Sequence, residues 1–514
     1  MNTIFKRYFI AIFLSLVVSN IYSQNEEDAL RYAINKVDGS ARFTGMGGAF
    51  SSLGGDLSAI TLNPAGITTF ATNQLSGSFS FFSTKNSAKY FNNQQNSDYT
   101  SFDDAIINVD QLGIVWIYKS DVSDWNKLAF GFNYNRAADY GNYLKIKGTN
   151  LDGNSVVNYF VDNAQGVRLG DIKVGNDETI DYVYQWLGEN AGFQTQQAFL
   201  GYQAYIINPV DETNDDNTVY TPNANFSNVE HLSKIYSTGN KGLAEFSFGG
   251  TYKKNLQLGL SLSLISINYQ ENNSIYESGY LPTSELKSLK FNNYLRVEGS
   301  GVQLKFGGIY KFDNKLRLSL AFHSPQWLEI NEFLKQNVHT EFNGYSPVDI
   351  APNIENSFAP YKIITPSKIV TGISKVFGKK GLVSIDYSYQ DFSSLRFKEK
   401  DVEADTDYFD SVNQWMSDNF QGVHSLNIGG ELKLSELSLR AGGFMTTSPY
   451  KNSNDLYAYS GYSLGAGYNF GGVIMDVAWQ HKKTTQAKTL TGLPDQAKID
   501  LSKNKIFIGF RYDF

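Results

Sequence analysis

The sequence predicts an all-β transmembrane barrel of about fourteen antiparallel strands. Three observations support this fold class. After Thr72 the chain alternates apolar and polar residues with a period of two, its connectors alternate between short and long, and its last strand ends on Phe514. In the clearest strand Gln257, Gly259, Ser261 and Ser263 separate the apolar residues Leu256, Leu258, Leu260, Leu262 and Leu264. Such alternation places one set of side chains on each face of a strand.

Composition agrees with a barrel rather than with a bundle of membrane helices. The chain has 514 residues, a formal net charge of −7, 41% hydrophobic residues and 15% aromatic residues. Beyond the first residues no apolar run approaches the roughly 20 residues that a membrane helix needs. The acidic balance argues against nucleic acid as a partner. Because the chain contains no cysteine, it can form neither disulfide bonds nor thiolate metal sites.

The first 23 residues have the features of a signal peptide. Lys6 and Arg7 supply the positive charge, Tyr8–Val18 is the apolar core, and the small Ser23 precedes the expected cleavage site. The apolar core is too short to anchor the chain as a spanning helix. We therefore expect a signal peptide over 1–23, a plug or hatch over 24–72, and the barrel over 73–514.

The alternating segments are even in number, as bacterial barrels require. They begin near residues 75, 112, 127, 244, 256, 299, 315, 367, 381, 423, 436, 461, 472 and 504. Short connectors are expected at Ser120–Asn126, Lys253–Asn255, Phe312–Asn314, Phe377–Lys380, Leu434–Ser435 and Phe470–Gly472. Long loops are expected at Thr84–Gln111, Arg136–Leu243, Glu271–Glu298, Leu328–Pro366, Phe397–Gly422, Thr447–Ser460 and Lys482–Lys503. Short periplasmic turns and long extracellular loops are typical of outer-membrane barrels, so we expect the chain in the outer membrane of a Gram-negative cell.

The sequence contains no constellation that indicates catalysis. The five histidines are scattered without metal-binding spacing, and no nucleophile elbow is present. We expect no enzyme activity, no metal and no cofactor. Two acidic clusters offer oxygen ligands that could hold calcium, although acidic loops are more often only solvated. These are Asp215 with Asp216, and Asp401 with Glu403 and Asp405.

Charged residues occur at positions that the alternation assigns to the lumen. The residues are Glu245, Lys305, Lys311, Arg317, Asp386, Glu431, Lys433, Arg440, Asp476, Arg511 and Asp513. One interpretation is a cross-paired wall that hydrogen-bonds the plug. Another makes a lumen arginine, with Arg317 and Arg440 as candidates, the partner of a substrate carboxylate.

The predicted plug has a distinctive order of motifs. Gly45-Met46-Gly47-Gly48-Ala49-Phe50 is followed by Asp56, by Ser58-Ala59, and by Asn63-Pro64-Ala65-Gly66. Closely spaced glycines suit a compact element that packs tightly on a wall. Asn-Pro disfavours a helical conformation at the asparagine and indicates a turn.

This order resembles the N-terminal hatch of the FadL/TodX family of outer-membrane transporters for long-chain fatty acids and other hydrophobic compounds. Later segments resemble family strands. They are Lys315–Pro325 with its Ser-Pro end, Asp386–Phe392, and Leu439–Gly442 followed by Ser448-Pro449. The resemblance covers hatch and barrel, and the family has fourteen strands.

The resemblance implies passive uptake without an energy source. A lipophilic ligand would be captured among the extracellular loops, enter a lumen pocket, and leave when the hatch shifts. Its ligand and hatch residues would include Gly47, Gly48, Asn63, Pro64 and Ala65. A kink in the third strand would open the wall sideways, and the matching segment, Leu128–Asn135, contains Phe130, Gly131 and Phe132.

The expected partners are a hydrophobic small molecule, outer-membrane lipids, and the insertion machinery that recognises a terminal Phe514. We expect a monomer. Two other functions stay open, a general diffusion porin for hydrophilic solutes and an adhesion or structural barrel that uses its long loops. Hemin is a lower-ranked ligand, and the long segment Arg136–Leu243 leaves the ligand's identity open. A plugged transporter should carry little steady current, which distinguishes it from a porin.

Overall fold

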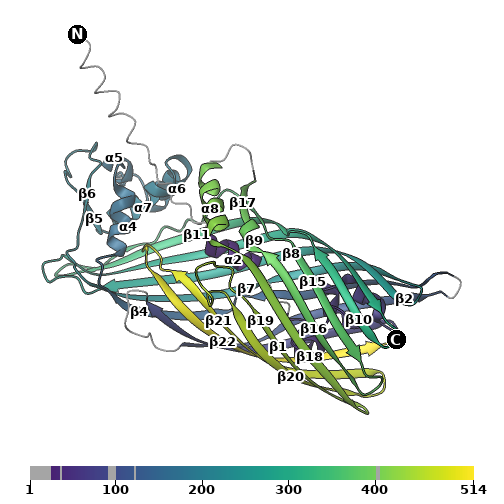
Figure 1. The fold of residues 1–514 in the computed structure, drawn as a ribbon. Coiled ribbons are helices and arrows are strands. Elements are labelled where there is room, and N and C mark those ends of the chain that lie inside the picture. The colour runs from purple at the N-terminus through teal and green to yellow at the C-terminus, as the bar shows by residue number, and fades with distance from the viewer. Residues whose placement is uncertain (1–24, 35–37, 91–99, 121–122, 401–405) are drawn as a thin grey trace, which may run out of the picture.

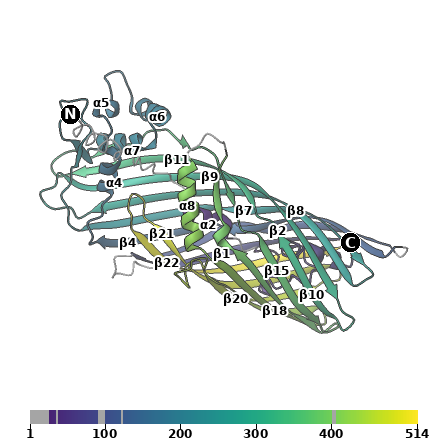
Figure 2. The ribbon, with the colours of Figure 1, turned by 45° about the horizontal axis from the view of Figure 1, so that its top comes forward.

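The strands close into a single barrel (Figures 1 and 2). The computed structural model describes residues 25–34, 38–90, 100–120, 123–400 and 406–514. The last strand, β22 (Gln496–Asp513), pairs with the first, β1 (Gln74–Tyr90), over the whole length of β1. The expected signal peptide lies outside the described residues.

The ring consists of fourteen staves, as the sequence predicts, where a stave is one long strand or two successive strands. Each stave pairs antiparallel with its neighbours. Four of them consist of two successive strands: in three the second strand continues the line of the first, and in the fourth it is offset. In order they are β1, β2 (Thr100–Lys119), β3 (Trp125–Asp139) with β4 (Asn142–Asn150), β7 (Val229–Tyr252), β8 (Leu256–Ser278), β9 (Leu286–Lys311), β10 (Leu316–His323) with β11 (Trp327–Phe342), β14 (Tyr361–Ile364) with β15 (Lys368–Val376), β16 (Gly381–Asp391) with the offset β17 (Arg396–Glu399), β18 (Gly422–Leu434), β19 (Leu437–Thr446), β20 (Tyr459–Asn469), β21 (Val473–Thr489) and β22. Two short strands, β12 (Val348–Ile350) and β13 (Asn356–Ser357), add to the edge of β11.

One end of the barrel carries the short turns and the C-terminus (Figure 1). The expected short connectors are confirmed there. Several need a left-handed backbone, with positive φ at Lys253, Lys254, Lys315 and Ser435. Residues with Cβ adopt this conformation at a cost, which two-residue hairpin turns accept because their twist matches that of the strands.

The outer surface near this end is apolar. Leu258, Leu260, Leu262 and Leu264 are 41–44% exposed, whereas Ser261 and Ser263 between them are buried. The same alternation recurs on the other staves and forms a belt of exposed aliphatic and aromatic residues. A continuous apolar belt over a polar interior is the surface that a barrel presents to lipid. The predicted inside–outside register is confirmed.

Beyond the belt the polarity of the strands inverts. On β8 the inward residues become Ile265, Ile267 and Tyr269, which are 3–4% exposed, and Ser266 and Asn268 face outward. The pairing of β8 with β7 and β9 continues through this point without a shift of register. The inversion therefore lies in the sequence, and the upper part of each such strand is built like the wall of a water-soluble protein.

This inversion corrects four of the expected loops. The segments Thr84–Gln111, Glu271–Glu298, Leu328–Pro366 and Lys482–Lys503 consist largely of strand. The loop between β8 and β9, for example, covers only residues 279–285. The outward apolar pattern ends where the strand leaves the lipid, but the backbone ladder continues.

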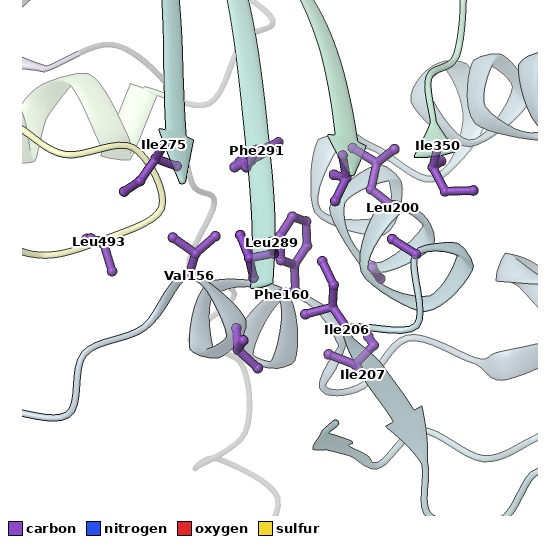
Figure 3. Packing of buried hydrophobic residues seen from close by; sticks show 14 of the residues in the cluster. Val156, Phe160, Leu200, Ile206, Ile207, Ile275, Leu289, Phe291, Ile350 and Leu493 are labelled. Carbon is purple, nitrogen blue, oxygen red and sulfur yellow. The ribbon is translucent and has the colours of Figure 1, made fainter. Parts of the chain in front are cut away.

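A helical dome closes the other end of the barrel (Figures 1 and 2). It is formed by α4 (Val156–Ala164), α5 (Leu169–Ile172), α6 (Ile180–Asn190) and α7 (Phe193–Gln203), with the small sheet of β5 (Ile207–Pro209) and β6 (Tyr220–Pro222). The segment Arg136–Leu243 is thus a folded unit between strand extensions rather than an open loop. Figure 3 shows its core, in which Val156, Phe160 and Leu200 pack against Ile275 and Phe291 from the strand tips.

One further helix, α8 (Thr406–Asn419), lies outside the dome, beside β17. Its Phe409 stacks on Phe397 with the ring centroids 5.3 Å apart. Among the helices that the structure describes, none is long and apolar enough to cross a membrane.

Candidate transport route and hatch

The N-terminal segment lies inside the barrel, where it forms the expected hatch (Figure 1). Its elements are α2 (Glu26–Ala33), α3 (Ala41–Gly45) and the 3₁₀ turns η1 (Ser58–Thr61) and η2 (Pro64–Thr69). Each of the longer elements begins with a polar cap. Asn25 forms a capping box with Asp28, and the Ser40 hydroxyl accepts a hydrogen bond from the Phe43 amide.

The hatch glycines allow tight turns against the wall. Gly47 and Gly48 have φ of +65° and +78°, a region that side chains with Cβ rarely adopt. A Cβ on Gly47 would lie 2.9 Å from the backbone nitrogen of Gly443. Both conformation and space therefore require glycine at position 47.

The matching glycines on the wall were not predicted from the sequence. A Cβ on Gly429 or Gly442 would lie 2.2 Å from backbone atoms of Met46. Others receive further parts of the hatch, and the set is Gly249, Gly259, Gly307, Gly372, Gly429, Gly442 and Gly465. All of them occupy inward positions of their strands, so glycine at a lumen-facing position was the signal that could have predicted a hatch seat.

The Asn63-Pro64-Ala65 turn is buried on this seat. The Asn63 amide nitrogen donates to the Ser51 and Gly308 carbonyls at 3.0 and 3.2 Å, and its oxygen accepts from the Ala65 amide at 3.0 Å. Pro64 is the first residue of η2, a position where its missing N–H costs nothing. These three residues hold the hatch against the wall and line none of the cavities described below, whereas Gly47 and Gly48 line one of them.

A ladder of opposite charges joins the hatch to the wall near the short-turn end. Arg42 of the hatch pairs with Glu431, which also pairs with Arg440. Arg440 reaches Asp476, and Asp476 accepts from Arg511 at 2.9 Å. The candidate lumen cation Arg440 is therefore fully engaged. The other candidate, Arg317, donates to the Leu53 carbonyl of the hatch at 2.6 Å. Both side chains fit the interpretation of a cross-paired wall that holds the plug.

Higher in the lumen a single lysine holds the hatch helix. Lys241 is completely buried, and its amine donates to the Tyr32 carbonyl at 2.7 Å and to Gln326 at 2.6 Å. A cation at the carboxyl end of a helix is favourable because unpaired carbonyls gather there. Below it, Lys505 pairs with Asp38 of the hatch at 2.6 Å.

Four cavities follow one another through the interior. An outer chamber of about 540 Å³ lies between α2 and the dome. It shares Glu27, Arg31 and Lys488 with the first of two middle cavities, which measure about 220 and 180 Å³. The second shares Gln480 with an inner cavity of about 110 Å³, which ends on Gly47 and Gly48. Neighbouring cavities share lining residues, so the series extends from the dome to the Gly47–Gly48 turn of the hatch.

The middle cavities combine apolar side chains with charged ones of both signs, among them Asp139, Lys482 and Lys503. Leu30, Ile34 and Leu144 line them on one side. Lys482 borders both, with its amine 4.5 Å from the centroid of the Tyr459 ring, and no carboxylate of the described residues lies within 4.0 Å of it. The arrangement can accept an anionic group beside an apolar chain.

The third stave is continuously paired at the segment where the resemblance implies a kink. Phe130, Gly131 and Phe132 pair with β2 on one side and β7 on the other without interruption. Gly131 instead makes room for Ile67 of the hatch, which lies 3.0 Å from its ideal Cβ. In this segment the hydrogen-bond ladder of the third stave has no break.

The break lies higher on the same stave. The β2–β3 ladder ends at the pair Gln111↔Asn135, although both strands continue. Above it β2 bulges and pairs only with β1, and β3 bulges at Arg136. The Arg136 guanidinium fills the gap and donates to Asn108 at 2.6 Å and to the Val109 carbonyl at 3.3 Å. The wall is thus closed here by a side chain rather than by backbone pairing.

The acidic pair Asp215 and Asp216 has different surroundings from a metal site. Asp215 pairs with Lys173 and Asp216 with Arg168, each at 2.6 Å. The cluster at 401–405 lies outside the described residues. Within the described part of the chain, no three His, Asp or Glu side chains are grouped as metal ligands.

Solved structures share this architecture. No family model and no curated protein matches the chain. A FadL homologue from Pseudomonas aeruginosa matches with a TM-score of 0.52 at 11% identity, over 93% of this chain and 99% of its own. The chain has the fold of this homologue. The CymD monoaromatic hydrocarbon channel matches at 14% identity and the toluene transporter TodX of P. putida at 12%, each with a TM-score of 0.50. They cover 93% of this chain and 97% and 99% of their own. The expected FadL/TodX fold is confirmed.

Proposed function

We propose that this protein is an outer-membrane channel for the passive uptake of hydrophobic small molecules, and that long-chain fatty acids are its substrates. The shared fold supports the general function, because the similar structures include a monoaromatic hydrocarbon channel and a toluene transporter. The apolar belt supports a place in a membrane. The observation that carries the substrate class is Lys482, which has no carboxylate within 4.0 Å among the described residues and borders the middle cavities together with Leu30, Ile34 and Leu144.

A fatty acid matches this pair of features. Its carboxylate would form a charge-assisted hydrogen bond with the Lys482 amine, which has no carboxylate partner among the described residues. Its chain would lie against Leu30, Ile34 and Leu144. Removing apolar surface from water contributes about 25 cal/mol per Å², so the chain supplies most of the affinity and the lysine selects the head group.

The hatch favours this function over a general diffusion porin. Porins keep an open aqueous lumen. Here the hatch lies inside the lumen and is held there by Arg42, Arg317 and Lys241. We expect little steady ionic current through the wild-type protein in a planar bilayer. A large, constant conductance would favour the porin.

Lys482→Met tests the fatty acid site, and the adjacent Lys483→Met is its control because Lys483 faces outward. We expect Lys482→Met to weaken the binding of radiolabelled oleate at least tenfold in equilibrium dialysis. Binding of hexadecanol, which has the same kind of chain without a charge, should change little. Equal oleate affinity in the wild type and Lys482→Met would remove Lys482 from the site.

We further propose that the ligand leaves sideways between β2 and β3, where Arg136 closes the wall. Ala138 and Asp139, just beyond Arg136, line a middle cavity. Because the chain has no native cysteine, the pair Asn108→Cys and Arg136→Cys can be cross-linked selectively with a short bismaleimide. The cross-linked protein should lose oleate uptake and retain oleate binding. Unchanged uptake would place the exit elsewhere, toward the periplasm through the hatch.

A further inference from the structure

Five lysines lie together on three neighbouring short turns of the barrel. They are Lys315 before β10, Lys375 near the end of β15, Lys379 and Lys380 in the β15–β16 turn, and Lys433 near the end of β18. Backbone hydrogen bonds join these turns. The Val376 amide donates to the Lys315 carbonyl at 3.2 Å, and the Lys433 amide donates to the Lys380 carbonyl at 2.9 Å. The five residues therefore form one continuous surface, the lysine patch.

The amines of the lysine patch have no ion-pair partner. No carboxylate of the described residues lies within 4.0 Å of any of them. The three turns contain two carboxylates, Asp313 and Glu436, so the patch keeps a net charge of +3. On the next short turn of the ring, by contrast, Lys253 pairs with Asp124 at 3.9 Å. Like charges on one surface repel each other, and an anion placed among them relieves the repulsion.

This positive charge is particular to the short-turn end. The whole chain has a net charge of −7, and the segment 151–228, which contains the dome helices, has 11 carboxylates and only 2 cations. The excess of lysine at the short turns is therefore a local feature and not a consequence of the overall composition. It matches a negatively charged partner at this end of the barrel.

Exposed apolar side chains lie between the lysines and place the patch at the edge of the lipid. Phe312 is 40% exposed, Phe377 54% and Leu434 51%. Aromatic residues continue around this end of the barrel, each 41–67% exposed: Tyr118, Trp125, Tyr310, Tyr468, Phe470, Tyr512 and Phe514. Such a girdle marks the level of the lipid head groups. Lysine stems can lie along this apolar surface while their amines reach the head groups.

We propose that the lysine patch binds anionic phospholipid in the leaflet at the short-turn end. The phosphate oxygens would accept charge-assisted hydrogen bonds from the amines, and the acyl chains would cover Phe312 and Phe377. This combination favours a lipid over a soluble acidic protein. The proposal rests on the proposed place of the barrel in a membrane, but it is independent of the transported ligand, because Lys482 lies inside the lumen.

Native mass spectrometry of the full-length protein in detergent tests the proposal. The protein is titrated with phosphatidylglycerol and with phosphatidylcholine of the same acyl chains, so that only the net charge of the head group differs. We expect roughly tenfold tighter binding of phosphatidylglycerol and a smaller preference at higher ionic strength. Equal affinity of the wild type for the two lipids would overturn the proposal without any variant. A tighter affinity for polyglutamate than for phosphatidylglycerol would assign the patch to an acidic protein segment instead.

Variants then locate the site. The triple variant Lys315→Gln, Lys379→Gln and Lys380→Gln should lose the preference for phosphatidylglycerol. The matched control, Lys290→Gln, Lys362→Gln and Lys398→Gln, removes the same charge from exposed positions on the strand extensions beyond the belt and should keep the preference. Heat-modifiability on gels verifies that each barrel is folded. A preference that survives in the folded patch variant, or that is lost equally in the control, would refute the assignment.

The proposed function can fail separately from this site. Lys482→Met should keep the preference for phosphatidylglycerol, and both triple variants should keep the oleate affinity of the wild type. Loss of the phospholipid preference in Lys482→Met would show that the lipid occupies the lumen and would overturn the assignment to the lysine patch.

Discussion

Replacing Gly307 by alanine should unseat the hatch while leaving the barrel intact. The ideal Cβ would lie 1.9 Å from the Asn63 side-chain oxygen, far inside contact distance. Gly308→Ala is a matched control, because its Cβ points outward and meets Leu258 at an ordinary 3.6 Å. Gly308 keeps the carbonyl that accepts from Asn63 in either variant.

The magnitude follows from what the Asn63 side chain must give up. It takes part in three hydrogen bonds, to Ser51, Gly308 and Ala65. At roughly 1 kcal/mol net for each bond, Gly307→Ala costs the seated hatch about 3 kcal/mol. That free energy corresponds to about a hundredfold shift toward the unseated state.

Hydrogen–deuterium exchange of the hatch measures this shift. Amides over 51–68 should exchange up to about a hundredfold faster in Gly307→Ala than in Gly308→Ala. Replacing both Asn63 and Pro64 by alanine should reach the same state from the hatch side and alter oleate uptake or leak. Wild-type exchange in a folded, heat-modifiable Gly307→Ala protein would refute the seating argument.

Three further predictions follow from burial, charge and topology. Leu260→Arg should impair assembly, because a charge on the lipid face near the midplane costs about 2–4 kcal/mol, whereas Ser261→Arg, which faces the lumen, should assemble far better, as heat-modifiability will show. Burial raises the pKa of Glu27 above its unfolded value, so α2 docking should weaken as pH rises from about 4.5 through the folded pKa. Glu27→Gln should remove this dependence in exchange measurements between pH 4.5 and 7.5, and an unchanged pH profile would exclude the carboxylate as its source. An epitope tag within 166–192 should be accessible on intact cells, and a tag in the 253–255 turn should not; the reverse result would invert the topology.

The membrane part of the fold could be predicted because lipid imposes a rule on every strand. Outward residues must be apolar there. The outward leucines between Leu258 and Leu264, the start of each stave and each short turn can therefore be recognised in the sequence. Outside the lipid that rule no longer holds. The inward residues Ile265 and Ile267 continue β8, but they resemble neither a lipid-facing strand nor an obvious loop.

The hatch motif was predicted with its turn, because Asn63-Pro64 and the glycines act locally on the backbone. The partners of that motif were not, since they depend on which inward positions face it after the barrel closes. Lys482 illustrates the difficulty. It lay in a segment expected to be a loop, and only the continued ladder of β21 turns it toward the lumen.

The inversion of polarity along β8 and β9 changes the height above the membrane at which a hydrophobic solute first contacts the protein. In a barrel that ends at the lipid surface, such a solute loses its water shell at bilayer depth. Here the staves continue beyond the belt by about 14 residues on β8, or roughly 45 Å measured along the strand at 3.3 Å per residue. Two clusters of buried apolar side chains lie along this part of the barrel. Under the proposed function, a solute that enters the outer chamber therefore leaves bulk water before it reaches the depth of the bilayer.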